Sequence, residues 1–141
     1  MGTNEKRCVL VPAAKATEGK TGVTYAAGVS AVSADARGLC LQLASLPPGG
    51  RSKAHQHDAH ESAAYVIEGE MAIWFGARLE HKVVAGPGDF VYIPDGVPHL
   101  VLNPSDTEQA VAVLARTDPN AQEEITELPE LEGLPDLGPE A

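Results

Sequence analysis

Between residues 38 and 117 the chain is divided into short apolar runs, and a glycine or proline follows almost every one. The runs are rich in β-branched and aromatic residues, and none has the apolar spacing of an amphipathic helix. We predict strands over seven of them: 39–46, 63–68, 71–75, 79–85, 90–93, 99–102 and 110–115. Many short strands with tight corners are typical of an all-β antiparallel sandwich or barrel.

Three local predictions accompany this pattern. Only Gly69 and Glu70 separate the runs 63–68 and 71–75, which indicates a β-hairpin. The run Cys8 to Val11, closed by Pro12, is predicted to be an edge strand, and residues 21–34 a loop or irregular strand.

The length of 141 residues and a hydrophobic content of 43% fit one domain with an ordinary core. Of the twenty acidic residues, eight lie in residues 118–141, which contain no Lys or Arg. We therefore divide the chain into a barrel over residues 1–117 and an acidic, proline-rich C-terminal tail over 118–141, extended or partly disordered. Leucines every three residues in this tail, from Leu128 to Leu137, would let an extended tail lie against a barrel.

The net charge of −10 and the absence of a Lys/Arg cluster argue against binding to nucleic acid or to an anionic membrane. Cys8 and Cys40 are far apart in sequence and form no CxxC motif, so we expect two reduced thiols. No secretory signal and no apolar run long enough to span a membrane is found, which predicts a cytoplasmic protein.

Four of the five histidines fall in two places. His55, His57 and His60 lie within six residues and are followed by Glu61, and His99 follows the turn-like sequence Asp95-Gly96-Val97-Pro98. Neutral imidazole is the commonest metal ligand in proteins, and such a set suits a transition metal better than Ca²⁺ or Mg²⁺. His55 and His57 are two residues apart, so on a strand both side chains leave the same face.

The residues around these histidines resemble the two motifs of the cupin superfamily. The second motif, G-x5-P-x-G-x2-H-x3-N, is met by Gly88, Pro94, Gly96, His99 and Asn103. The first motif, G-x5-H-x-H-x3/4-E-x6-G, is met by Gly49, His55, His57 and Gly69, but counting back from Gly69 places Ser62 in the glutamate position and Glu61 one residue early. The motifs cover residues 49–103, and the strand pattern extends the resemblance to about 38–117.

The resemblance implies an all-β, double-stranded β-helix (jelly-roll) barrel that binds one divalent transition metal and forms homodimers. Zinc is favoured, with iron, nickel, manganese or copper as alternatives. Within the superfamily the chain resembles a bacterial group of stand-alone cupins, with aromatic polyketide cyclases among the nearer characterised relatives.

The fourth metal ligand is either His60 or Glu61. On a regular strand, His60 would share the inward face of Ser62, Ala64 and Val66, whereas a β-bulge would turn Glu61 inward instead. We favour the four-histidine set His55, His57, His60 and His99. Glu61 is then a candidate catalytic base, with a metal-bound hydroxide as the alternative base.

These observations predict a metal-dependent enzyme that acts on a small, partly apolar, aromatic or polyketide-like molecule by cyclisation, isomerisation or oxygenation. The alternative is a non-catalytic small-ligand binding or sensor protein that uses the same pocket. Strand parity turns Tyr65 and Ile67 away from the metal, and this apolar face predicts a homodimer. His81, between Glu80 and Lys82, is expected to be an ordinary surface residue.

Overall fold

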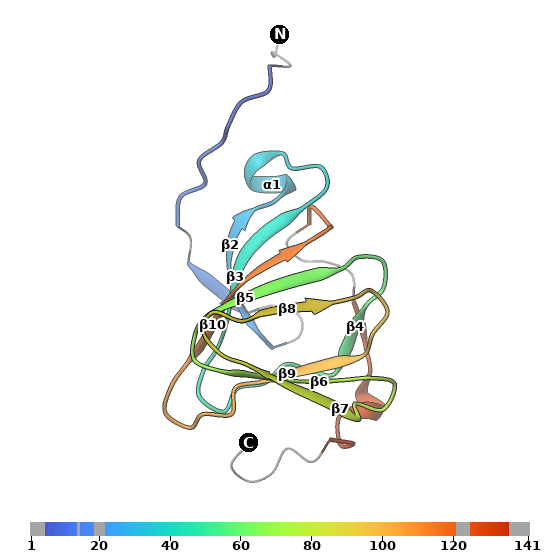
Figure 1. The fold of residues 1–141 in the computed structure, drawn as a ribbon. Helices are drawn as coiled ribbons and strands as arrows, with labels where there is room; N and C mark the ends of the chain where they lie inside the picture. The colour runs from blue at the N-terminus through green and yellow to red at the C-terminus, as the bar shows by residue number, and fades with distance from the viewer. Residues whose placement is uncertain (1–4, 14, 19–21, 121–124, 136–141) are drawn as a thin grey trace.

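The computed structural model describes residues 5–13, 15–18, 22–120 and 125–135. Their strands form two antiparallel sheets, of six strands in the order β1-β2-β3-β10-β5-β8 and of five in the order β11-β4-β9-β6-β7 (Figure 1). The six-stranded sheet contains β1 (Ala16–Glu18), β2 (Thr24–Val29), β3 (Cys40–Leu46), β5 (Ser62–Glu68), β8 (Phe90–Ile93) and β10 (Ala110–Arg116). The five-stranded sheet contains β4 (His55–His57), β6 (Met71–Phe75), β7 (His81–Ala85), β9 (His99–Leu102) and β11 (Ile125–Glu127).

From β4 onward the chain passes repeatedly between the two sheets, as in a jelly-roll barrel. The predicted all-β jelly-roll fold is therefore confirmed. The seven predicted strands are present, with bounds that differ by at most two residues.

The predicted hairpin over residues 63–75 is wrong. β5 pairs with β10 and β8, whereas β6 pairs with β7 and β9, so the chain crosses from one sheet to the other at Gly69. Gly69 has a φ of 72°, and a Cβ atom here would lie 2.3 Å from the carbonyl oxygen of Gln109. The glycine is needed for this close crossing rather than for a two-residue hairpin turn.

Two predictions for the first third of the chain have different outcomes. Residues 5–13 form no strand, so the predicted edge strand at Cys8 to Val11 is wrong, and β1 instead pairs with β2. The irregular region predicted at 21–34 contains β2 and the short helix α1 (Ala31–Ala34), whose N-cap is Ser30. No disulfide joins exposed Cys8 to buried Cys40.

Apolar side chains pack on both faces of the five-stranded sheet. Between the sheets, Val66, Met71 and Ala112 belong to one buried cluster, and Leu46 to another. On the outer face, a further cluster is covered by the C-terminal segment of residues 125–135, which contains β11 and the 3-10 helix η1 (Pro129–Leu131). This segment of the predicted tail lies on its own barrel, while Leu137 lies outside the described residues.

Asn103, the last residue of the second motif, joins the turns at one end of the barrel. Its side chain is completely buried, and its amide nitrogen donates to the carbonyl oxygens of Leu46, Pro47 and Glu108 at 2.7–3.2 Å. Its side-chain oxygen accepts from the backbone nitrogen of Ser105. The motif asparagine therefore has a structural role. No helix in the described part of the chain is both long and apolar enough to cross a membrane.

Candidate metal centre

Two neighbouring strands position three histidines on the inner face of the barrel. His55 and His57 are the first and last residues of β4, and His99 is the first residue of β9, directly opposite His55 in the β4–β9 register. The side chains of all three are buried, with 4%, 7% and 2% of their surface exposed. The sequence prediction that these three imidazoles converge is confirmed.

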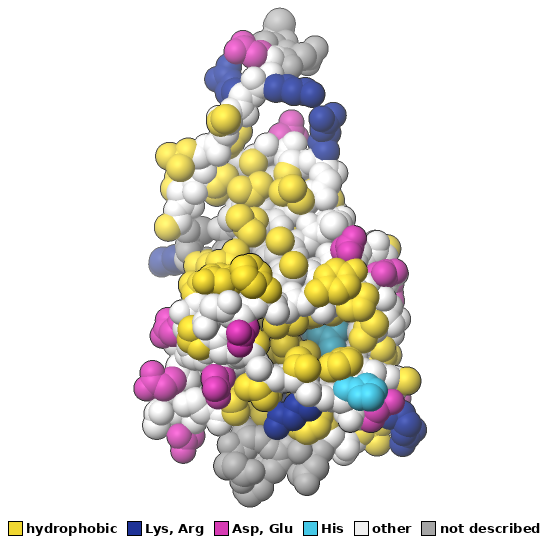
Figure 2. Space-filling view, in the orientation of Figure 1, with side chains coloured by type: hydrophobic (Ala, Val, Ile, Leu, Met, Phe, Trp, Pro, Cys, Tyr) yellow, Lys and Arg dark blue, Asp and Glu magenta, His cyan; other side chains and the backbone are white. Residues whose placement is uncertain are grey.

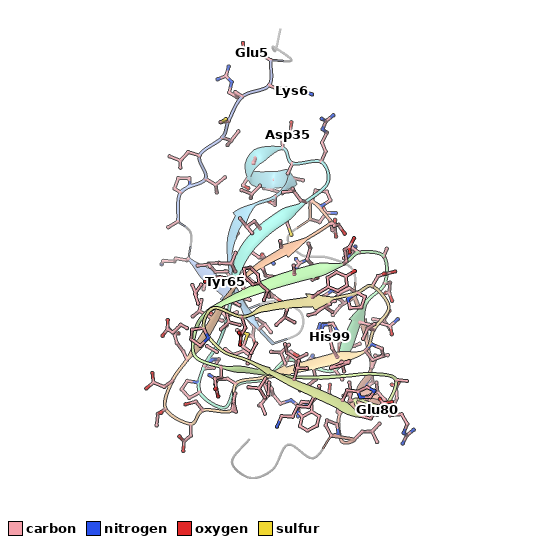
Figure 3. The ribbon with its side chains drawn as sticks, in the orientation of Figure 1. Glu5, Lys6, Asp35, Tyr65, Glu80 and His99 are labelled. Carbon is pink, nitrogen blue, oxygen red and sulfur yellow. The ribbon has the colours of Figure 1, made fainter. Side chains whose placement is uncertain are left out.

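The three rings are close enough to share one ion. The ring centroids of His55 and His99 lie 4.3 Å apart, and that of His57 lies 5.0 Å from each of them. One ligand nitrogen from each ring falls within 4.8 Å of the others. His99 is labelled in Figure 3, where it lies between the two sheets.

Backbone carbonyl groups orient two of the rings. Nδ1 of His55 donates to the carbonyl oxygen of Lys53 at 2.7 Å, and Nδ1 of His99 donates to that of Val97 at 2.9 Å. Each hydrogen bond holds the proton on Nδ1, so Nε2 is the nitrogen of that ring that can bind a metal.

Burial keeps His99 neutral in the metal-free protein. Its pKa is lowered from 6.5 to about 3, first because burial disfavours the charged ring and second because His55 lies nearby. A neutral imidazole is the form that binds metal, so no proton has to be displaced from His99 near neutral pH.

A divalent transition metal fits this donor set. Three oriented neutral imidazoles on a buried face suit zinc, iron, nickel, copper or manganese, and three protein ligands leave coordination positions for a substrate or water. The set His55, His57 and His99 does not distinguish among these metals.

His60 lies beside the three-histidine cluster rather than within it. Its ring centroid is 6.2 Å from that of His57, and its Nε2 lies 3.6 Å from Oδ2 of Asp118. Both side chains are nearly buried, with 10% and 11% of their surface exposed. His60 as the fourth ligand stays a prediction.

The side chain of Glu61 is directed toward the outer surface. It is exposed, and its carboxylate accepts a hydrogen bond of 2.6 Å from the hydroxyl of Tyr92, whose pKa is raised mainly by this bond. The inward face of β5 instead carries Ser62, Ala64 and Val66, as strand parity predicted. A catalytic role for Glu61 would require residues 58–61 to rearrange, and it too stays a prediction.

The histidines form part of the wall of a mostly apolar cavity of 70 Å³ between the sheets. No Lys, Arg, Asp or Glu is among the described residues that line it. A larger groove of 510 Å³ lies between β8 and the β6–β7 edge, and it shares Ile73, Val91, Ile93 and His99 with the cavity. In Figure 2 a histidine is visible in a hollow bordered by hydrophobic side chains, at the position labelled His99 in Figure 3.

Two structural features of the site were not predicted from the sequence. The first is Ser52, which is buried and whose hydroxyl accepts from the backbone nitrogen of Val101 and donates to the carbonyl oxygen of Lys53. The second is the pairing of β11 with β4, the strand that carries His55 and His57. A serine three residues before the first motif histidine is a weak signal for the role of Ser52, and no short-range pattern indicates the pairing of β11 with β4.

Fold and site together define a class, that of jelly-roll barrels with a histidine-ligated metal site on the inner face. The Cupin domain family matches residues 42–115, which is more than half of the sequence. The chain belongs to the cupin family.

Three relatives illustrate the range within this family. The chain is 31% identical over 84 residues to germin-like protein subfamily T member 3 of Arabidopsis thaliana, covering 57% of this chain and 37% of that protein. It is 31% identical over 68 residues to quercetin 2,3-dioxygenase of Bacillus subtilis (strain 168), covering 48% of this chain and 19% of that protein. The match thus spans well under half of either curated relative.

The third relative is a solved structure, the polyketide cyclase RemF from Streptomyces resistomycificus. It superposes with a TM-score of 0.64 over 91% of this chain and 86% of that chain, at 20% identity. At this identity the similarity shows the fold alone.

Proposed function

We propose that this cupin is a metal-dependent enzyme that acts on a small, mostly apolar, oxygen-containing molecule by cyclisation, isomerisation or oxygenation. The observation that carries the proposal is the convergence of His55, His57 and His99 on the wall of a mostly apolar cavity. When bound, a metal such as zinc would supply Lewis acidity, and a redox-active metal would supply dioxygen activation.

The protein's own residues would perform the remaining tasks. Lys53 and Val97 offer the carbonyl groups that fix the imidazole orientation, and the apolar lining would exclude water from the reacting atoms. No Lys or Arg is among the described residues of the lining, which favours a neutral substrate such as a phenol, enol or ketone over a dicarboxylate. Two of the relatives named above, a quercetin 2,3-dioxygenase and a polyketide cyclase, have names consistent with a substrate of this neutral, oxygen-containing class.

The cavity of 70 Å³ is far smaller than the roughly 300–1,000 Å³ that is typical of ligand pockets. The groove of 510 Å³ that reaches His99 lies in that range. We therefore assign the reacting oxygen atoms of the substrate to the cavity and its apolar body to the groove.

The second candidate is a non-catalytic cupin that binds a small ligand at the same site. The position of Glu61 favours it, because with Glu61 on the surface the described cavity lining contains no carboxylate base. Incubation of metal-loaded protein with phenolic and polyketide-like compounds, followed by mass spectrometry, distinguishes the two. Binding without any product would support the second candidate.

Metal analysis of the purified protein tests what both candidates share. We expect one divalent metal per chain in the wild type and an affinity lowered by at least about 100-fold in His55→Ala and His99→Ala. His81→Ala is the matched control, because His81 lies on exposed β7 outside the cluster. Equal metal content in all four proteins would contradict the proposed site.

A further inference from the structure

Ser62 is a buried serine among the residues that line the cavity together with the histidines. It is the first residue of β5, only 3% of its surface is exposed, and it lines the same cavity as His55, His57 and His99. Its Oγ has no hydrogen-bond partner among the described residues. A buried hydroxyl without a partner is unfavourable, so such a group in a pocket indicates an absent ligand.

No other described residue of the cavity lining has an unpaired buried polar atom in its side chain. The hydroxyl of Ser52, the other serine of the cavity, both donates and accepts a hydrogen bond. Trp74 also has an unpaired Nε1, but it packs on the outer face of the five-stranded sheet beneath Lys82. Among the described residues that line the cavity, the unpaired hydroxyl is therefore specific to position 62.

We infer that Ser62 is a substrate-contacting residue whose hydroxyl donates a hydrogen bond to an oxygen atom of the bound molecule. This inference rests on the proposed function and specifies the polar end of its substrate. A serine hydroxyl is a neutral donor and a poor metal ligand compared with imidazole, so Ser62 serves the substrate rather than the metal.

The neighbours of Ser62 define the orientation of that molecule. Ser62 is paired with Ile93 across the β5–β8 ladder, and Ile93 belongs to the wall shared by the cavity and the groove. A molecule that places its oxygen between Ser62 and the histidines can therefore pass Ile93 and extend its apolar body into the groove. A neutral aromatic hydroxyketone has this combination of a compact oxygenated end and a flat apolar body.

The test uses the zinc-loaded 141-residue chain and the fluorescent hydroxyketone 3-hydroxyflavone, since redox-inert zinc prevents oxygenation of this probe while its binding is measured. Ser62→Ala is expected to bind zinc as the wild type does and to bind 3-hydroxyflavone about three- to tenfold more weakly, as loss of one neutral hydrogen bond predicts. Ser62→Thr, which keeps the hydroxyl, should restore most of the affinity. Ser45→Ala removes a hydroxyl from β3 outside the cavity and should have no effect.

A second variant tests the position of residue 62 without any organic ligand. Ser62→Glu places a carboxylate in the cavity, and we expect it to raise zinc affinity at least about tenfold in competition with a chromophoric chelator. An unchanged zinc affinity in this variant would overturn the placement of residue 62 beside the metal.

The remaining outcomes separate this inference from the proposed function. If Ser62→Ala binds 3-hydroxyflavone like the wild type, or if this variant loses zinc, the proposed role of Ser62 is overturned. The metal site of the wild type is unaffected by either result. Wild-type protein that holds zinc but does not bind 3-hydroxyflavone overturns the hydroxyketone class and this contact with it. Wild-type protein that holds no metal overturns the proposed function itself.

Discussion

His99 is the most deeply buried of the three clustered imidazoles, and its protonation links the site to stability. In the metal-free protein its pKa is lowered to about 3, whereas the unfolded chain has the ordinary value near 6.5. Between these values the unfolded state binds a proton that the folded state does not. The contribution of neutral His99 to the free energy of unfolding is therefore complete above about pH 6.5. As the pH falls toward 3, this contribution is lost by at most about 1.4 kcal/mol per pH unit.

Urea unfolding of the metal-free protein from about pH 7 to about pH 5 measures this dependence. We expect the free energy of unfolding to fall with pH in the wild type and to fall less steeply in His99→Gln. Equal slopes for the two proteins would show that His99 does not carry the effect.

His60 and Glu61 are adjacent in sequence but lie in different environments. Because Glu61 bonds Tyr92 on the outer surface, we expect Glu61→Gln to leave metal affinity unchanged and to lower the raised pKa of Tyr92. Loss of metal by this variant would instead restore Glu61 as a ligand.

The role of His60 can be decided by how far its substitution lowers metal affinity. If it is a ligand, His60→Ala should lose at least about 100-fold in metal affinity, as for His99→Ala. If it only packs beside His57 while paired with Asp118, a loss of at most about tenfold is expected, with Asp118→Asn having a similar effect. Chelator competition separates these two results.

The sequence supports some of these residue assignments better than others, for a physical reason. His55, His57 and Ser62 lie on regular strands, where side chains alternate strictly between faces, so parity predicts their directions. Residues 58–61 belong to no strand, and alternation does not apply there. His60 instead lies near Asp118, a contact 58 residues away in sequence that no local pattern encodes.

Among the elements, β4 is the one on which the metal site depends most. It is three residues long, and it pairs with β9 only at His55 and with β11 at all three positions. Glu132, just beyond η1, accepts a 2.6 Å hydrogen bond from the backbone nitrogen of Ala54 and forms an ion pair with Arg51. The C-terminal segment therefore fixes the strand that carries two of the three imidazoles.

Glu132→Ala should loosen β4 without touching the histidines. We expect a loss of about 1–3 kcal/mol in stability, since one acceptor serves both a buried backbone donor and a guanidinium group, and about three- to thirtyfold weaker zinc binding. Thermal unfolding and chelator competition measure the two effects. Glu130→Ala is the matched control, because Glu130 is exposed on η1, and an equal effect of both variants would contradict the role of Glu132.

The positions of the strands were predicted well, because Gly/Pro corners delimit the apolar runs in the sequence. The pairing of the strands was not predicted. The short Gly69-Glu70 connection is compatible with either a hairpin or a crossing, and the contact of Gly69 with Gln109 selects the crossing. Likewise, the leucines at 39, 41 and 43 indicated a strand, yet these three are exposed while Cys40 and Gln42 face inward. Alternation identifies the two faces of a strand but not which of them is buried in the barrel.

On the scale of the whole molecule, the outer face of the six-stranded sheet is apolar across four strands. Leu43, Val113, Tyr65 and Phe90 are successive partners in the β3-β10-β5-β8 ladder and form one row. Leu43, Tyr65 and Phe90 are 41%, 38% and 79% exposed. Figure 2 shows hydrophobic side chains on this part of the surface, near the position of Tyr65 labelled in Figure 3. A contiguous apolar row of this kind is unusual on a monomer.

We predict that a second copy of the chain covers this face and that the dimer influences the groove, because Phe90 and Tyr92 belong to both. Tyr65→Lys combined with Ile67→Lys should convert the protein to a monomer in sedimentation velocity, since buried charges without partners are strongly unfavourable. Val32→Lys, on exposed α1, is the control and should stay dimeric.

The monomeric variant should keep its zinc, whose ligands lie on the other sheet, but should bind 3-hydroxyflavone more weakly because the rim formed by Phe90 and Tyr92 is no longer supported. A wild-type protein that sediments as a monomer would contradict the interface, and a monomeric variant with unchanged flavone affinity would separate the interface from the groove.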